Sequence, residues 1–145
     1  MSNLAGGLQS FIHNNKFFVK FFLIDDQLNL NRWAVTQASI LRRISSFLGK
    51  PFILRKDYGH TKARDGDELL RKQDQDKVGT IIDVGIEDNT GKAFGIAEIK
   101  DEWAQNAIKN NEVRFVSPAI VFHDHDLINT GGKEIVTDWI GAHVA

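Results

Sequence analysis

The chain has 145 residues, of which 42% are hydrophobic and 26% are charged, and its formal net charge is −1. This composition is typical of one folded domain and excludes a disordered chain. The nearly balanced charge argues against a nucleic-acid partner, and the apolar runs are too short to cross a membrane. With no cysteine, disulfides, thiolate metal sites and a cysteine nucleophile are excluded. The start shows no signal-peptide pattern, so we expect an intracellular protein in a reducing compartment.

The N-terminal region predicts an arm followed by strands. Residues 1–16 are rich in Gly, Asn and Ser and predict a flexible arm or short helix. The run Lys16–Ile24 is aromatic and β-branched, which predicts a buried strand. Arg32–Val35 predicts a short second strand. We therefore expect one domain over residues 17–145.

A helix and a charged loop follow. Thr36 is a suitable N-cap for a helix over Gln37–Leu48 that Gly49 would end, and its apolar residues fall on one face: Ile40, Ile44, Phe47 and Leu48. Phe52–Leu54 predicts a strand. Residues 55–76 are dominated by charge and predict an exposed, mobile loop.

The second half has a more regular pattern. Val78–Ile86 and Lys92–Ile99 predict a hairpin around a Gly-containing turn. Asp101 would cap a helix through Asn110, with three residues inward: Trp103, Ala107 and Ile108. Val113–Phe122 predicts a strand, and a Gly-Gly turn leads to a last strand, Glu134–Ala145.

These elements together predict an α+β domain with mostly antiparallel strands. We count about six or seven strands and two or three flanking helices. Short strands separated by turn signals favour closure, so we expect a closed or nearly closed barrel.

Ser117 is the first residue that could carry chemistry. In the predicted strand it shares a face with apolar residues, and Pro118 places the segment at an edge, an end or a bulge because it removes a ladder donor. A hydroxyl there could face a cleft and act as a nucleophile. A structural hydrogen bond to a nearby carbonyl is the alternative.

Two histidines could serve that hydroxyl. His60 follows a predicted strand and opens the charged loop, a position suited to the mouth of a cleft. His143 lies in an apolar strand, where it could orient a second imidazole. Read singly, each also fits a structural role.

A rival constellation is His123-Asp124-His125-Asp126. Histidines two residues apart could share a face and bind a metal with a carboxylate from elsewhere. A solvated strand end is the plainer interpretation of the same residues.

Several segments resemble, in order, the capsid-maturation (prohead) serine proteases of tailed viruses, which are relatives of the herpesvirus assemblins. The matching motifs are Gly49-Lys50-Pro51-Phe52-Ile53-Leu54 followed by a histidine, Val78-Gly79-Thr80-Ile81-Ile82-Asp83-Val84 with Gly95-Ile96-Ala97-Glu98-Ile99, Arg114-Phe115-Val116-Ser117-Pro118-Ala119, and Ile140-Gly141-Ala142-His143-Val144-Ala145. The resemblance covers roughly residues 17–145 and implies a herpesvirus-protease-like fold.

The resemblance also implies roles for individual residues. Ser117 would be the nucleophile, His60 the general base and His143 the residue that holds His60. Phage members often use an acidic third residue, so Asp138 is the alternative, with Asp124 a poorer one. In assemblins a loop after the last matched strand supplies oxyanion-stabilising groups, and here the sequence stops at Ala145, which leaves an inactive or incomplete site open.

The implied activity is serine endopeptidase processing of scaffold and capsid proteins during viral head maturation. It implies self-association and a location in the host cytoplasm or viral procapsid, with no cofactor, metal, membrane or nucleic acid. Two other functions stay open: a non-catalytic virion assembly module with the same barrel, and a small metal-binding domain built on His123 and His125.

Overall fold

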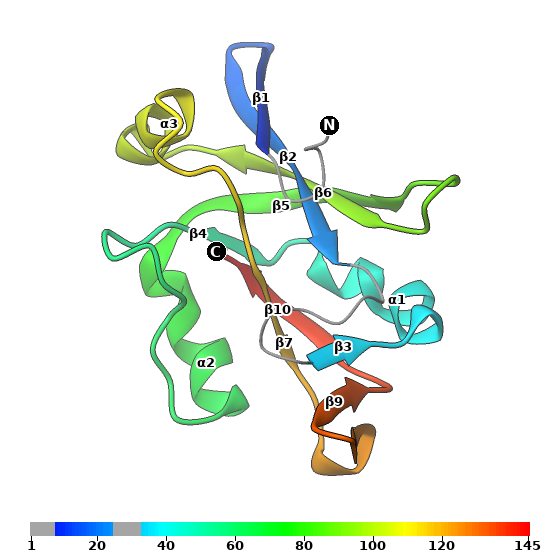
Figure 1. The fold of residues 1–145 in the computed structure, drawn as a ribbon. Coiled ribbons are helices and arrows are strands. Elements are labelled where there is room, and N and C mark those ends of the chain that lie inside the picture. The colour runs from blue at the N-terminus through cyan, green and yellow to red at the C-terminus, as the bar shows by residue number, and fades with distance from the viewer. Residues whose placement is uncertain (1–7, 25–32) are drawn as a thin grey trace.

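The computed structural model describes residues 8–24 and 33–145, in which strands predominate and three α-helices lie around them (Figure 1). The strands are β1 (Leu8–His13), β2 (Lys16–Ile24), β3 (Trp33–Val35), β4 (Pro51–Ile53), β5 (Lys77–Ile86), β6 (Ala93–Ile99), β7 (Pro118–Val121), β8 (Leu127–Thr130), β9 (Lys133–Val136) and β10 (Ile140–Val144). The helices are α1 (Gln37–Arg43), α2 (Gly66–Lys72) and α3 (Glu102–Lys109), with short 3₁₀ helices η1 (Ile44–Phe47), η2 (Gln73–Asp76) and η3 (Asp124–Asp126).

The strands form two open sheets. Seven strands pair in the order β1-β2-β6-β5-β4-β10-β7, and a separate three-stranded sheet has the order β3-β9-β8. The α+β class with mostly antiparallel strands agrees with the sequence-based prediction, but the closed or nearly closed barrel is wrong. Closure needs a pairing between the two edge strands. In the described part of the chain, β1 pairs only with β2, and β7 pairs only with β10.

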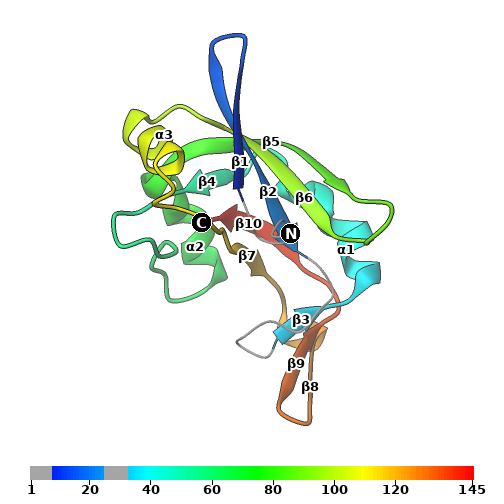
Figure 2. The same ribbon diagram turned by 45° about the horizontal axis from the view of Figure 1, so that its top comes forward.

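The N-terminal strands form a hairpin that projects from the rest of the sheet (Figure 2). Its two-residue loop has positive φ angles of 50° at Asn14 and 63° at Asn15, which fit a type I′ turn. Residues 8–13 are thus a strand where we expected an arm, while residues 1–7 of that arm lie outside the described residues. The predicted strand Lys16–Ile24 is confirmed as β2, and it alternates buried and half-buried residues through Leu23.

The two predicted helix caps are present. The side chain of Thr36 accepts a hydrogen bond from Ser39 N at the start of α1, and Asp101 accepts one from Ala104 N at the start of α3. These bonds satisfy backbone donors that have no partner within the helix.

Two apolar residues of the predicted helices lie at the surface. Leu48 is 46% exposed because α1 ends at Arg43 and the chain tightens into η1. Trp103 is 37% exposed on α3, where the ammonium of Lys56 lies 5.2 Å from its ring centroid. The helix predicted through Leu48 is therefore too long, and the inward position predicted for Trp103 is wrong. A helical period alone does not show which residues of a helix are covered by neighbouring elements.

The charged segment 55–76 is only partly a loop. Asp65 caps α2 by accepting a hydrogen bond from Glu68 N at 2.9 Å, and η2 follows directly. Glu68 and Gln73 are buried, at 6% and 4% exposure. The prediction of an exposed loop throughout this segment was wrong.

The C-terminal third contains more strands than expected. The predicted hairpin before it is confirmed as β5 and β6. The predicted strand Val113–Phe122 is reduced to β7, and the region expected to be one last strand contains β9 and β10, with β8 before them. The Gly131-Gly132 turn joins β8 to β9 rather than leading into the final strand, and both glycines have positive φ angles, 54° and 78°.

None of the helices in residues 8–24 and 33–145 is long and apolar enough to span a membrane.

Candidate functional site

The pairing of β7 with β10 places Ser117 diagonally opposite His143. Ser117 N donates to Ala145 O at 2.6 Å, and Ala145 N donates to Ser117 O at 2.9 Å, while Ala119 is the register partner of His143. Side chains of directly opposed residues share one face of a sheet, as do residues two apart. Ser117 and His143 therefore lie on the same face, at the position where β7 begins.

A turn after β4 delivers His60 to this position. Tyr58 N donates to Arg55 O at 2.9 Å, and Tyr58 has a positive φ of 58°, an unusual value for a bulky residue. Gly59 N then donates to Asp57 Oδ1 at 3.0 Å. These local bonds reverse the chain immediately before His60.

A second set of bonds holds the chain after His60. Thr61 is buried, and its hydroxyl donates to Asp76 Oδ2 at 2.8 Å. The guanidinium of Arg55 lies 3.3 Å from the same carboxylate oxygen. The loop is therefore tied on both sides of the histidine, once to itself and once to η2.

His60 and His143 form a hydrogen-bonded pair. His60 Nδ1 lies 2.7 Å from His143 Nε2, and the ring centroids are 4.9 Å apart. His143 is fully buried, and its Nδ1 lies 3.0 Å from Oε1 of Gln73. The three side chains make one chain of contacts from η2 to the loop after β4.

Burial keeps both imidazoles neutral near pH 7. Desolvation lowers the pKa of His60. Desolvation first, and then the neighbouring His60, lower the pKa of His143 to about 4, although Asp76 opposes the shift. A neutral imidazole can accept a proton, as a general base must.

Ser117 and His60 line one cavity of about 360 Å³. Its other lining residues come from β3, β7, the chain beside β7, and β9: Trp33, Pro118, Ala119, Ile120, Phe122, Glu134 and Val136. A neighbouring cavity of about 320 Å³ is also lined by His60 and contacts β7 and the start of α2. Ser117 itself is exposed, and no hydrogen bond joins its hydroxyl to His60.

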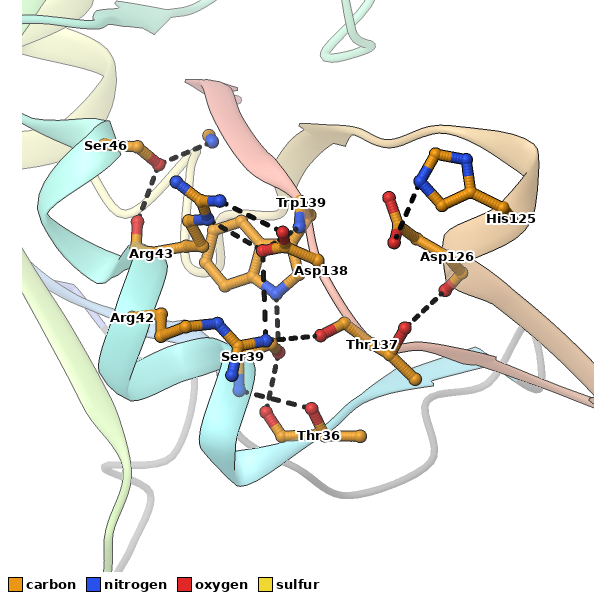
Figure 3. Close-up of polar contacts among 11 residues, drawn as sticks. Thr36, Ser39, Arg42, Arg43, Ser46, His125, Asp126, Thr137, Asp138 and Trp139 are labelled. Atoms are coloured by element: carbon orange, nitrogen blue, oxygen red, sulfur yellow. Dashed lines mark hydrogen bonds and ion pairs between the residues drawn. The ribbon is translucent and has the colours of Figure 1, made fainter.

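Asp138 lies in a different cluster, shown in Figure 3. Its carboxylate accepts hydrogen bonds from Arg43 Nε at 2.7 Å and Nη2 at 3.0 Å, and from the backbone N–H of Trp139 at 3.0 Å. The Arg43 hydrogen bond is the main cause of a pKa lowered to about 2. The structure brings His60, His143 and Ser117 together and leaves Asp138 paired with Arg43; Asp124, the poorer candidate, is exposed in η3.

The histidines of the rival metal site stack on each other at the surface. The rings of His123 and His125 are 5.3 Å apart between centroids, and both residues are exposed. Within the described residues, no group of three or more His, Cys, Asp or Glu side chains is placed to hold a metal ion. The geometry therefore gives the metal-binding interpretation no support.

Gln73 is the site residue that the sequence analysis missed. It lies within the charged run that predicted a loop. The spacing of Asp65 and Glu68 was the available signal, because an N-cap acid followed three residues later by Glu marks a helix start. A helix begun there continues towards Gln73.

Comparisons with known proteins identify a structural relative only. No protein-family profile and no curated protein matches the sequence. The fold is similar to that of the bacteriophage T4 capsid assembly protease gp21, with a TM-score of 0.65 and 11% sequence identity over 98% of this chain and 87% of that protein. The chain therefore shares its fold with that protein. At this level of identity the likeness establishes the fold but not the activity.

Proposed function

We propose that this protein is a serine endopeptidase that processes scaffold and capsid proteins during viral head maturation. The observation that carries the proposal is the hydrogen-bonded pair His60–His143 in contact with the cavity that contains Ser117. The similarity to a phage capsid assembly protease supports the choice of substrates and a procapsid location.

Each of the three residues has a separate task in this proposal. Ser117 Oγ attacks the scissile carbonyl carbon while His60 Nε2 takes its proton, which forms a tetrahedral oxyanion. His60 then gives that proton to the leaving amine, the C–N bond breaks, and an acyl-Ser117 ester remains. A water molecule deprotonated by His60 hydrolyses the ester, and Ser117 recovers its hydrogen.

His143 supports the charged form of His60. The imidazolium that forms on His60 donates through Nδ1 to His143 Nε2, which lies at 2.7 Å. Because His143 is buried and neutral, this bond is made in a poorly solvated environment, where it is stronger than in water. His143, rather than Asp138, therefore fits the third role.

Proton transfer requires the Ser117 hydroxyl to approach His60. Catalytic hydrogen bonds are often long in the free enzyme and shorten when substrate binds. β7 is an edge strand beside the cavity, so an extended peptide segment could pair along it and bring the scissile bond to Ser117.

A serine-reactive fluorophosphonate tests the nucleophile. The wild-type protein should be labelled, whereas Ser117→Ala and His60→Ala should lose labelling, and Ser45→Ala at an exposed serine should retain it. Ser117→Ala and His60→Ala should also fail to cleave scaffold and capsid proteins of the parent virus, whereas Ser45→Ala should cleave them. Labelling that persists in Ser117→Ala would refute Ser117 as the nucleophile. A folded wild-type protein that never labels would favour the non-catalytic assembly module.

A further inference from the structure

Gln73 has a buried side-chain amide that contacts the histidine pair. It lies at the start of η2 and is 4% exposed, and its Oε1 faces His143 Nδ1 at 3.0 Å. The residues around it on the chain are charged and mostly exposed. A buried polar side chain within such a segment calls for a specific partner, and that partner is His143.

The contact determines which ring nitrogens carry protons. An amide oxygen only accepts hydrogen bonds, so His143 Nδ1 must carry the hydrogen. A neutral imidazole has one N–H, which leaves His143 Nε2 as an acceptor. His60 Nδ1 must then be the donor across the 2.7 Å contact, and His60 Nε2 is left unprotonated.

We propose that Gln73 is a positioning residue that holds His60 in the tautomer with a bare Nε2, ready to accept the proton of Ser117. The inference rests on the proposed function for its catalytic meaning. Gln73 acts through His143 and does not itself contact the cavity that contains Ser117. The opposite amide orientation would donate to His143 Nδ1, reverse both histidines and leave His60 Nε2 protonated.

The tautomers can be read directly by ¹⁵N NMR of the ring nitrogens in the wild-type protein, with no substrate. At about pH 7.5, where both rings are neutral, His60 should show a protonated Nδ1 and an unprotonated Nε2, and His143 should show the same pattern. A protonated His60 Nε2 would overturn the inference without any variant being made.

Variants at Gln73 test whether this residue is the cause. Gln73→Met keeps the length but removes the acceptor, so the His60 signals should shift towards a mixture of tautomers. Gln75→Met, at an exposed glutamine of the same 3₁₀ helix, is the matched control and should change nothing. Unchanged His60 signals in a folded Gln73→Met protein would overturn the inference.

Turnover separates this inference from the proposed function. Gln73→Met should lower kcat by about tenfold or more with little change in KM, since one buried hydrogen bond typically corresponds to about that factor. If the wild type shows the expected tautomers but no peptidase activity, the proposed function fails and the tautomer assignment stands. If the enzyme is active and Gln73→Met turns over normally, the positioning role fails instead.

Discussion

Acidification should destabilise this protein through His143 before its carboxylates begin to protonate. Burial lowers the pKa of folded His143 from an ordinary 6.5 to about 4. As the pH falls through this window, the unfolded chain binds a proton at this position that the folded protein does not, so stability falls as well. The lowered pKa of His60 acts in the same direction.

The size of the effect follows from the shift in the pKa of His143. Between about pH 7.5 and about pH 5 the free energy of unfolding should fall by about 2 kcal/mol, out of about 3 kcal/mol for complete titration. Asp138, whose pKa is lowered to about 2 from 3.8, contributes only below this range. The window therefore isolates the histidines from this carboxylate.

Urea unfolding at the two pH values measures this loss. His143→Asn removes the buried imidazole, so most of the difference between the two pH values should disappear, whatever the absolute stability of the variant. His13→Asn, at an exposed histidine of the β1–β2 hairpin, should retain the wild-type difference. Equal wild-type stability at both pH values, or an undiminished difference in His143→Asn, would show that His143 is not held as a buried neutral group.

Three further predictions concern Trp139, Gly141 and Asp138. Trp139→Phe removes the 2.7 Å hydrogen bond from the buried indole to Ser39 Oγ and should cost about 1–3 kcal/mol in urea unfolding; no loss would mean that the hydroxyl is satisfied without it. Gly141→Ala would place a Cβ 2.6 Å from the Phe47 ring and should cost about 1–3 kcal/mol, whereas a neutral outcome would require that ring to move freely. Asp138→Asn should leave peptidase activity close to that of the wild type, and a loss as deep as that of Ser117→Ala would restore Asp138 as the third catalytic residue.

Local sequence signals correctly predicted a strand and two helix starts. The aromatic and β-branched run Lys16–Ile24 and the caps Thr36 and Asp101 depend on neighbours within a few residues, and the structure has a strand and two helix starts where expected. Barrel closure is not local, because it depends on which strands meet at the sheet edges. The short β7 and the separate sheet of β3, β8 and β9 leave those edges unpaired with each other.

The candidate site divides in the same way. Ser117, His60 and His143 were proposed as site residues from short motifs and their order along the chain. Gln73 was missed because charge dominates its neighbours, whereas its burial comes with a contact to His143, a residue distant in the sequence. Asp138 was a reasonable alternative by residue type. In the structure its carboxylate forms a charge-assisted hydrogen bond with the guanidinium of Arg43 instead.

The three side chains Gln73, His143 and His60 are joined by hydrogen bonds that involve no charged group at neutral pH. Burying a carboxylate beside His60 would require desolvation of a full charge, whereas a neutral chain of amide and imidazoles can be buried once each donor meets an acceptor. The same burial that makes His143 neutral, and so able to accept from the His60 imidazolium, makes the protein sensitive to acid. The loss of stability between about pH 7.5 and about pH 5 and the ring tautomers therefore both depend on His143 being buried and neutral. If His143 were solvated, the acid sensitivity would disappear, and the strong hydrogen bond that supports the base would be lost with it.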